Sequence, residues 1–265
     1  MRKNLTTEKL QKVLARAGIG SRRQMEKWIS EGKVQVNNRT ASLGIRVSAR
    51  DQIKVNGKVL KKHLSAGRKS ALEVILYHKP VGEISSRRDP AQRKTVFDNL
   101  PKPLSGRWVS VGRLDINTSG LMLFTNDGSL ANQLMHPSSQ VDREYAVRTY
   151  GTASEAKLDL LRNGIQIDNI TYKFDDVVDS GGEGRNHWYH VVLREGKNRE
   201  VRNMFAAIDL PVSRLQRVRY GPFLLANLSP GKTRALGKKD IKYLKDYLKK
   251  CKLSAVEAAE DSKSL

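Results

Sequence analysis

The stretch VGRLDINTSGLMLFTNDG, residues 111–128, decides how the chain is organised. A strand-like run, Trp108–Val111, leads into it, and a second apolar run occupies Leu121–Thr125. The loop between these runs contains one arginine, Arg113, one carboxylate, Asp115, and several turn-forming residues. A loop that is held by two strands and presents a carboxylate beside an arginine is typical of a catalytic or binding site. Alternatively, Asp115 only caps a turn by accepting hydrogen bonds from the backbone that follows it, and the loop alone favours this simpler interpretation.

Composition indicates a polyanionic partner. The 265 residues include 49 Lys and Arg against 27 Asp and Glu, a formal net charge of +22. An imbalance of this size favours binding to nucleic acid. A membrane surface is a poorer partner, because no segment combines a strong apolar face with Trp or Phe anchors, and no stretch has the apolar length of a membrane span. The hydrophobic content of 38% suffices for a core, and the length suggests one large and one small domain.

Metal and redox chemistry are not expected. Cys251 is the single cysteine, which excludes an internal disulfide and a cysteine-based zinc site. The five histidines are scattered along the chain, so we expect no metal. The N-terminus begins with polar and charged residues and no apolar signal segment, which predicts a cytoplasmic protein.

The first sixty residues predict a compact helix–turn–helix–strand unit. Apolar residues recur at helical spacing from Leu10 to Ala17, and glycines follow them. Ser21 and Gln24 fit the capping box of a second helix. Alternating runs at 33–37 and 52–56 predict short strands.

Basic residues crowd these two helices and the turn between them. A solvated helix surface is the simplest interpretation. Acidic neighbours are sparse, however, so a surface that binds RNA phosphates is favoured. The predicted RNA-binding residues of this unit are Lys9, Lys12, Arg16, Ser21, Arg22, Arg23 and Lys33.

The N-terminal unit resembles the S4 RNA-binding domain. The resemblance rests on EKLQKVLARAGIGSRRQMEKWISEGKVQVNN, residues 8–38, and on DQIKVNGK, residues 51–58. It covers residues 8–60 and implies binding to structured RNA. S4 domains occur in many unrelated RNA proteins, so this resemblance names no activity.

The remaining chain predicts a larger α+β domain. Residues 61–70 are basic and without periodicity, which predicts a linker. Many strands and few, unevenly placed helices between residues 71 and 250 indicate a mainly antiparallel, mixed sheet flanked by helices and loops. Residues 251–265 are low in large apolar side chains and are expected to be a disordered tail.

Four motifs of the larger domain occur in a defined order. They are Arg113-Leu114-Asp115 in the loop quoted above, Arg143-Glu144-Tyr145, GKNREVRNM at 196–204, and SRLQRVRYG at 213–221. Together they resemble the RsuA-type branch of the pseudouridine synthases, which isomerise uridine in RNA. With the S4 unit, the resemblance extends from residue 8 to about residue 248. It implies an isomerase that requires no cofactor.

The resemblance also implies roles for individual residues. Asp115 is the essential residue, as a nucleophile at C1′ or as a base that yields a glycal intermediate. Arg202 forms an ion pair with Asp115, and Tyr145 stacks on the target base. Arg113 enters the space that the flipped-out uridine leaves, and Leu215 packs beside the base.

Two further arginines lie in these motifs. Arg199 is predicted to bind the substrate RNA, and for both Arg199 and Arg217 the simplest interpretation is binding to backbone phosphates.

Shorter segments narrow the resemblance within this branch. FDNLP at 97–101 and the NRE triplet at 198–200 match synthases of large-subunit ribosomal RNA. They imply a uridine in 23S rRNA near the peptidyl-transferase centre, as naked RNA or in a precursor particle. A member of the same family that acts on a different rRNA uridine is the nearest alternative.

Two other classes of function compete with this prediction. The charge and the S4 unit alone also fit a non-catalytic rRNA-binding or ribosome-assembly factor. An RNA methyltransferase would require a Gly-rich cofactor loop after the first strand of a doubly wound domain, and the sequence has none. We expect a monomer.

Overall fold

The computed structural model describes residues 7–60, 71–87 and 89–261, with side chains as far as residue 254. The chain divides into two compact units. Unit 1 holds the described residues up to Glu73 together with Pro101–Val109 and Thr125–Gly128. Unit 2 holds Val74–Leu100, Ser110–Phe124 and the described residues from Ser129 onward. The predicted linker, residues 61–70, lies outside the described residues.

Unit 1 begins with the predicted pair of helices, α1 (Leu10–Arg16) and α2 (Arg22–Ser30). The Ser21 hydroxyl caps α2 by accepting the Gln24 N–H at 3.1 Å. A four-stranded sheet follows in the order β3-β2-β5-β6, and β1 (Glu8–Lys9) pairs with β4 (Arg46–Val47). The sheet strands are β2 (Val34–Val36), β3 (Arg39–Thr40), β5 (Ile53–Val55) and β6 (Lys58–Val59). One apolar cluster joins both helices to this sheet, with Leu10, Leu14 and Met25 fully buried.

A close backbone contact within unit 1 joins the turn after α1 to the segment Pro101–Val109. Gly18 and Gly106 both have positive φ, at 81° and 71°. A Cβ on Gly18 would lie 3.1 Å from the Gly106 carbonyl oxygen, and a Cβ on Gly106 would lie 2.9 Å from the Arg16 carbonyl oxygen. Glycine is therefore favoured at both positions.

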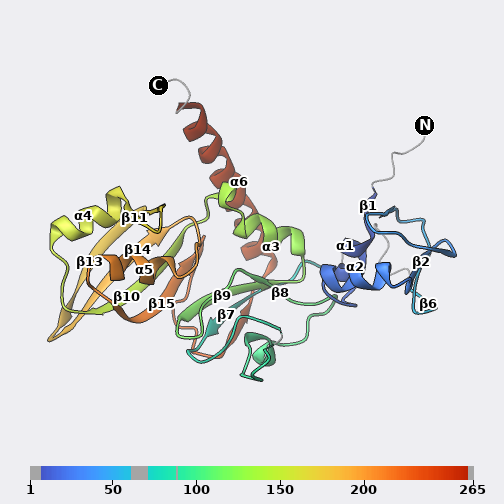
Figure 1. Ribbon diagram of the computed structural model, residues 1–265, viewed down its shortest axis with the longest axis horizontal. Coiled ribbons are helices and arrows are strands. Elements are labelled where there is room, and N and C mark those ends of the chain that lie inside the picture. Colours follow the sequence, from blue (N-terminus) through green and yellow to red (C-terminus); the bar gives the residue numbers. More distant parts are fainter. Residues whose placement is uncertain (1–6, 61–70, 88, 262–265) are drawn as a thin grey trace. The chain divides into compact units, whose positions relative to one another are not determined.

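Unit 2 is built on a mixed sheet with the strand order β13-β14-β10-β15-β9-β7-β17 (Figure 1). Strand β16 pairs with β15, and β8 pairs with β9. In chain order the strands are β7 (Val74–Lys79), β8 (Val109–Val111), β9 (Ser119–Thr125), β10 (Arg143–Tyr150), β13 (Asp176–Glu183), β14 (Asn186–Leu193), β15 (Val212–Tyr220), β16 (Phe223–Leu224) and β17 (Thr233–Ala235). The pairs from β13 to β15 are antiparallel, whereas β15 and β9 run parallel. The predicted α+β class with a mainly antiparallel, mixed sheet is confirmed.

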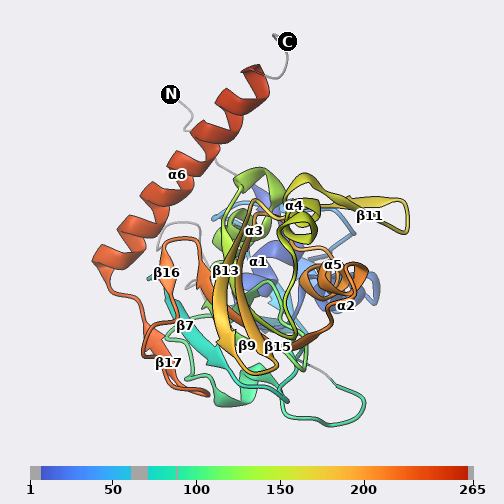
Figure 2. The ribbon, with the colours of Figure 1, turned by 90° about the vertical axis from the view of Figure 1, so that its left-hand side faces the viewer.

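Helices and short turns surround this sheet. They are the 3-10 turn η2 (Val96–Asn99), α3 (Gly128–Met135), the 3-10 turn η3 (Pro137–Ser139), α4 (Glu155–Asn163), α5 (Glu200–Ala207) and α6 (Lys238–Asp261). The hairpin strands β11 (Ile165–Ile167) and β12 (Ile170–Tyr172) follow α4. Figure 2 shows α4 and α5 on one side of the strands β13 and β15. Their apolar side chains, among them Leu161 and Phe205, join Val147, Val191 and Leu215 of the sheet in one buried cluster.

The C-terminal region differs from the sequence-based expectation of a disordered tail from residue 251. Helix α6 continues through Cys251 as far as Asp261. Leu244 and Leu248 are 0% and 4% exposed, so burial fixes the first part of the helix. The sequence after Cys251 is rich in alanine, which has the best helix propensity, so the helix continues although it has few large apolar residues to bury.

Candidate active site

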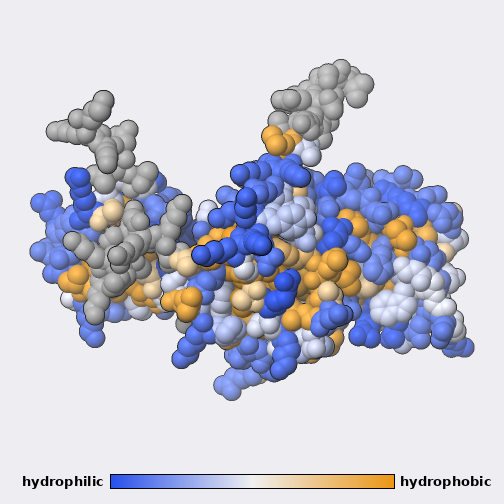
Figure 3. Space-filling model, turned by 180° about the vertical axis from the view of Figure 1, so that it is seen from behind, coloured by the Kyte–Doolittle hydropathy of each residue, from blue (hydrophilic) through white to orange (hydrophobic). Residues whose placement is uncertain are grey.

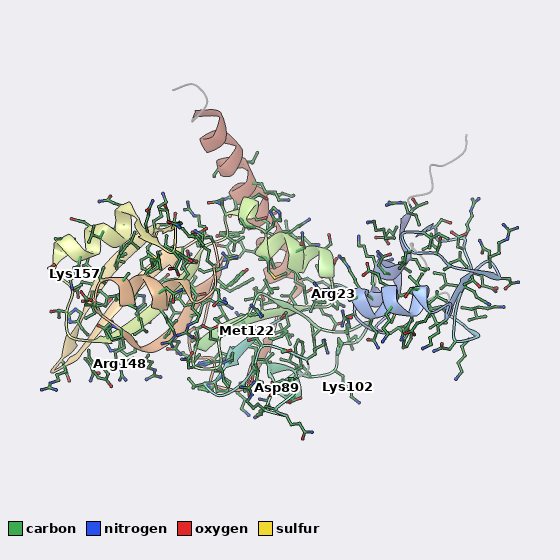
Figure 4. All side chains as sticks on the ribbon, viewed as in Figure 1. Arg23, Asp89, Lys102, Met122, Arg148 and Lys157 are labelled. Atoms are coloured by element: carbon green, nitrogen blue, oxygen red, sulfur yellow. The ribbon has the colours of Figure 1, made fainter. Side chains whose placement is uncertain are left out.

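The loop that carries Asp115 lies between β8 and β9. Gly112 begins it with a φ of 77°, and the Thr118 N–H donates to the Asp115 carbonyl oxygen at 3.0 Å to close a turn. The Ser85 hydroxyl binds the backbone of Leu114 and lies 3.6 Å from the sulfur of Met122, which Figure 4 labels on β9. The loop therefore projects from a rigid base, and the Asp115 side chain is 42% exposed.

A buried lysine supports the far side of the same loop. Lys79 ends β7, is fully buried, and donates from Nζ to the carbonyl oxygens of Thr118 at 2.8 Å and Ile116 at 3.5 Å. Burial lowers the pKa of Lys79 to about 8, against the opposing effect of the carboxylates Glu83 and Asp115. The sequence analysis missed this residue. Its only signal was one charged residue at the end of the otherwise apolar strand VILYHK.

Gly120 allows β15 to approach β9. Its φ is 118°, and it pairs with Arg217 in the parallel ladder. A Cβ at this position would lie 2.3 Å from the Arg217 carbonyl oxygen and 2.4 Å from its nitrogen, closer than real Cβ contacts allow. The glycine in the motif NTSGL therefore brings the strand that carries Leu215 and Arg217 beside the Asp115 loop.

Two arginines of the segment around α5 contact the Asp115 loop. Arg199 occupies the N-cap of α5 in a left-handed conformation, and its Nη1 lies 3.8 Å from Asp115 Oδ2. Arg202 instead donates to two backbone oxygens, those of Asn117 at 2.9 Å and Val212 at 3.0 Å. The ion pair predicted for Arg202 is therefore formed by Arg199 in the structure. Arg202 joins the Asp115 loop to the start of β15.

The environment of Arg202 explains this difference. Burial and the neighbouring charge of Arg199 lower the pKa of Arg202, and Asp115 acts in the opposite direction. Its Nε is buried without a partner. A half-buried guanidinium gains more from two carbonyl acceptors than from a partly exposed carboxylate. The family resemblance assigned this ion pair to Arg202, and the sequence analysis gave Arg199 only a role in binding RNA.

Tyr145 faces a buried arginine across the β10–β15 ladder. The two residues are cross-strand partners beside a β-bulge between Glu144 and Tyr145. The Arg217 guanidinium lies 6.0 Å from the centre of the Tyr145 ring and 4.9 Å from that of Tyr220, and its Nε donates to the Leu121 carbonyl oxygen at 2.7 Å. Arg217 is only 2% exposed, so in this structure it lies inside the unit rather than at a phosphate-binding surface. It supports the Tyr145 ring by a cation–π contact.

The two other predicted site residues of unit 2 have different exposures. Arg113 is exposed at the start of the loop. Leu215 is 5% exposed and belongs to the apolar cluster against which Tyr145 packs. The structure thus brings four predicted site residues into one unit: Asp115, Arg199, Arg202 and Tyr145. Lys79 and Arg217 support them, while Arg113 extends into solvent.

The predicted RNA-binding residues of unit 1 have different local partners. Lys12 and Arg16 both form ion pairs with Glu8, at 2.9 and 2.7 Å, and Lys33 pairs with Glu31 at 2.6 Å. Ser21 caps a helix. Lys9, Arg22 and Arg23 are exposed, and Figure 4 labels Arg23 on α2. The sequence analysis missed Arg107, whose pKa is lowered by burial and by the charge of Arg22.

Neither a metal site nor a membrane span is found in the described residues. Within 7–60, 71–87 and 89–261, no group of three or more His, Cys, Asp or Glu side chains could hold a metal ion. None of the helices described there is long and apolar enough to cross a membrane.

Comparison with known proteins assigns the class of this fold. The RNA pseudouridylate synthase family model matches residues 73–207, and the S4 domain model matches residues 8–53. The chain belongs to the RNA pseudouridylate synthase family, as the sequence motifs predicted. A crystal structure of a pseudouridylate synthase matches with a TM-score of 0.61 and 25% identity, and the match covers 89% of this chain and 99% of that one.

Individual relatives narrow the likeness to one type of synthase. The chain is 52% identical over 241 residues to the ribosomal large subunit pseudouridine synthase B of Pseudomonas aeruginosa, a match that covers 90% of this chain and 62% of the relative. It is 50% identical to the enzyme of that name from Vibrio vulnificus, with 91% and 75% covered, and 52% identical to that from Escherichia coli K12, with 81% and 74% covered. The chain therefore spans about three fifths of the Pseudomonas protein. The predicted resemblance to synthases of large-subunit ribosomal RNA is confirmed.

Proposed function

We propose that the protein converts a uridine of large-subunit ribosomal RNA to pseudouridine. Its family membership and its relatives, which are named ribosomal large subunit pseudouridine synthase B, support this function. The observation that carries the proposal is the Asp115 carboxylate, which lies at the tip of a loop clamped by Lys79 and Arg202. A single exposed carboxylate on a rigid support suits a reaction that requires one group to approach C1′ of a flipped-out nucleotide.

The reaction is an isomerisation, so its atoms balance without a cofactor. The N1–C1′ bond breaks, the uracil turns, a C5–C1′ bond forms, and the hydrogen of C5 leaves as a proton while N1 gains one. Asp115 either attacks C1′ or removes a proton to give a glycal. Both roles require a negatively charged carboxylate, and Arg199 at 3.8 Å and the nearby Lys79 place positive charge beside it.

The other residues hold the substrate and the loop. In this proposal, Tyr145 stacks on the uracil, supported from within the unit by Arg217. Arg199 contacts Asp115 directly and Arg202 positions its loop. Arg113, exposed beside the loop, occupies the space vacated by the uridine, and the basic residues of the S4 domain bind RNA phosphates.

The finer features of the expected function are also part of this proposal. We place the target near the peptidyl-transferase centre of 23S rRNA, in naked RNA or a precursor particle, and the reaction in the cytoplasm. We also propose that the protein acts as a monomer.

The test is release of tritium from rRNA labelled at uracil C5 and lacking this modification. Isomerisation expels the C5 hydrogen, so release reports the reaction without assuming the target. We expect one equivalent from each 23S molecule and none from 16S rRNA. No release from 23S rRNA or from precursor particles would favour the non-catalytic assembly factor instead. Release from 16S rRNA only would assign a different substrate.

A further inference from the structure

A stripe of lysines follows one face of α6, apart from the site described above. Lys238, Lys242, Lys245, Lys249 and Lys252 are separated by four, three, four and three residues. At about 100° per residue, these five side chains lie within about 40° of a common direction. We call them the lysine stripe. Over fourteen residues at about 1.5 Å each, it is about 21 Å long.

The lysine stripe is exposed and has little charge compensation among the described side chains. All five side chains are exposed. Within the described side chains, the stripe makes one ion pair, between Lys249 and Asp246 at 3.6 Å. Figure 3 shows hydrophilic side chains over much of α6 below its grey end. Like charges three and four residues apart destabilise an isolated helix, so the stripe is unfavourable unless an anionic partner offsets it.

One face of α6 is used for packing and is not available to a partner. Leu244 and Leu248 are buried, and α6 contacts η3. The segment 238–254 contains seven lysines and two aspartates, with neither Trp nor Phe. A bilayer would require a free apolar face with aromatic anchors, whereas the phosphate backbone of a nucleic acid requires only a positive one.

We propose that the lysine stripe of α6 binds the phosphate backbone of the substrate RNA, as a contact surface additional to the catalytic site and the S4 domain. A nucleic-acid duplex carries one phosphate per about 1.7 Å of its axis, so a stripe of 21 Å can meet several phosphates at once. The contact adds affinity without sequence discrimination, because lysine binds a phosphate as a point charge. The proposal rests on the proposed function for the identity of the RNA.

The test compares the salt dependence of binding to unmodified 23S rRNA. The variant carries Lys→Gln at all five stripe positions, and its helix content is checked by circular dichroism. Each phosphate contact contributes about 0.7 to 0.9 to the slope of log Kobs against log salt, so the loss of five contacts is expected to lower the magnitude of the slope by about 3.5 to 4.5. The variant with Lys→Arg at the same positions is expected to keep the wild-type slope.

A matched pair on the same helix controls for net charge. Lys242→Gln with Lys245→Gln removes two stripe charges, whereas Lys239→Gln with Lys250→Gln removes two exposed charges on another side of α6. We expect a change in slope of about 2 for the first pair and almost none for the second. Equal changes for both pairs would mean that only net charge matters and would overturn the proposal.

Two further outcomes would also overturn it. One is an unchanged slope for the five-position variant. The other is binding to phosphatidylserine-containing vesicles that depends on the stripe while RNA binding does not. Failure of the isomerase function is a separate result, because it appears as absent tritium release by the wild-type protein whatever the binding slope.

Discussion

Replacement of Gly120 by alanine tests whether the close β9–β15 pairing holds the site together. The new Cβ would lie 2.3 Å from the Arg217 carbonyl oxygen, on a residue with a φ of 118°. Backbone strain at such a position costs about 1–3 kcal/mol, and overpacking adds about 1–3 kcal/mol. We therefore expect Gly120→Ala to lower the free energy of unfolding by about 4 kcal/mol.

Two other glycines of unit 2 separate these contributions. Gly112 has a φ of 77° but nothing within 4 Å of an added Cβ, so Gly112→Ala should show the strain alone, about 1–3 kcal/mol. Gly196 has neither a positive φ nor a close neighbour, so Gly196→Ala should change stability by less than about 0.5 kcal/mol.

The assay is thermal and urea unfolding followed by circular dichroism. For a domain of this size, 4 kcal/mol corresponds to a fall in Tm of about 8–16 °C. The expected order of destabilisation is Gly120→Ala, then Gly112→Ala, then Gly196→Ala. A Gly120→Ala protein as stable as Gly196→Ala would refute the argument that β9 and β15 require a glycine at this contact.

Three further predictions concern Arg202, Lys79 and Glu200. Arg202→Lys cannot bridge two carbonyl oxygens in the same way, so kcat for tritium release should fall about 10- to 100-fold with little change in KM; an unchanged kcat would contradict the positioning role. The lowered pKa of Lys79, about 8, means that the unfolded state binds more protons between pH 8 and pH 10. The free energy of unfolding relative to that of Lys79→Met should therefore rise over that interval. A fall would contradict a lowered pKa for Lys79. Burial, followed by the neighbouring Glu195, raises the pKa of Glu200 to about 7, so the folded state binds more protons between pH 4.5 and pH 7. The free energy of unfolding relative to that of Glu200→Gln, measured by chemical denaturation, should therefore fall from pH 5 to pH 7.5. A rise would contradict a raised pKa for Glu200.

The regular elements could be predicted from the sequence because their patterns were local. The run Arg143–Tyr150 alternates and forms β10, and Ser154 precedes a helical apolar pattern that forms α4. The continuation of α6 to Asp261 was missed, because the prediction weighed large apolar residues and not helix propensity. The overall α+β class followed from the order of these patterns.

The candidate site was predicted in part, and the missing part depends on tertiary contacts. The motifs placed Asp115, Tyr145 and Arg202 in one site. Spacing along the chain could not reveal that Arg199 is the closer partner of Asp115, since this depends on the left-handed turn at the start of α5. Nor could it reveal Lys79, whose role comes from its hydrogen bonds to the carbonyl oxygens of Thr118 and Ile116 in the loop.

The central claim, that Asp115 performs the isomerisation, is tested most directly by tritium release under single-turnover conditions with excess protein. Asp115→Asn keeps the size of the side chain and removes its charge. Asp168→Asn makes the same change at an exposed turn residue with a positive φ, where asparagine is equally suitable. We predict that wild type and Asp168→Asn release one equivalent per 23S rRNA molecule, and that Asp115→Asn releases none. Release by Asp115→Asn at the wild-type rate would contradict the account.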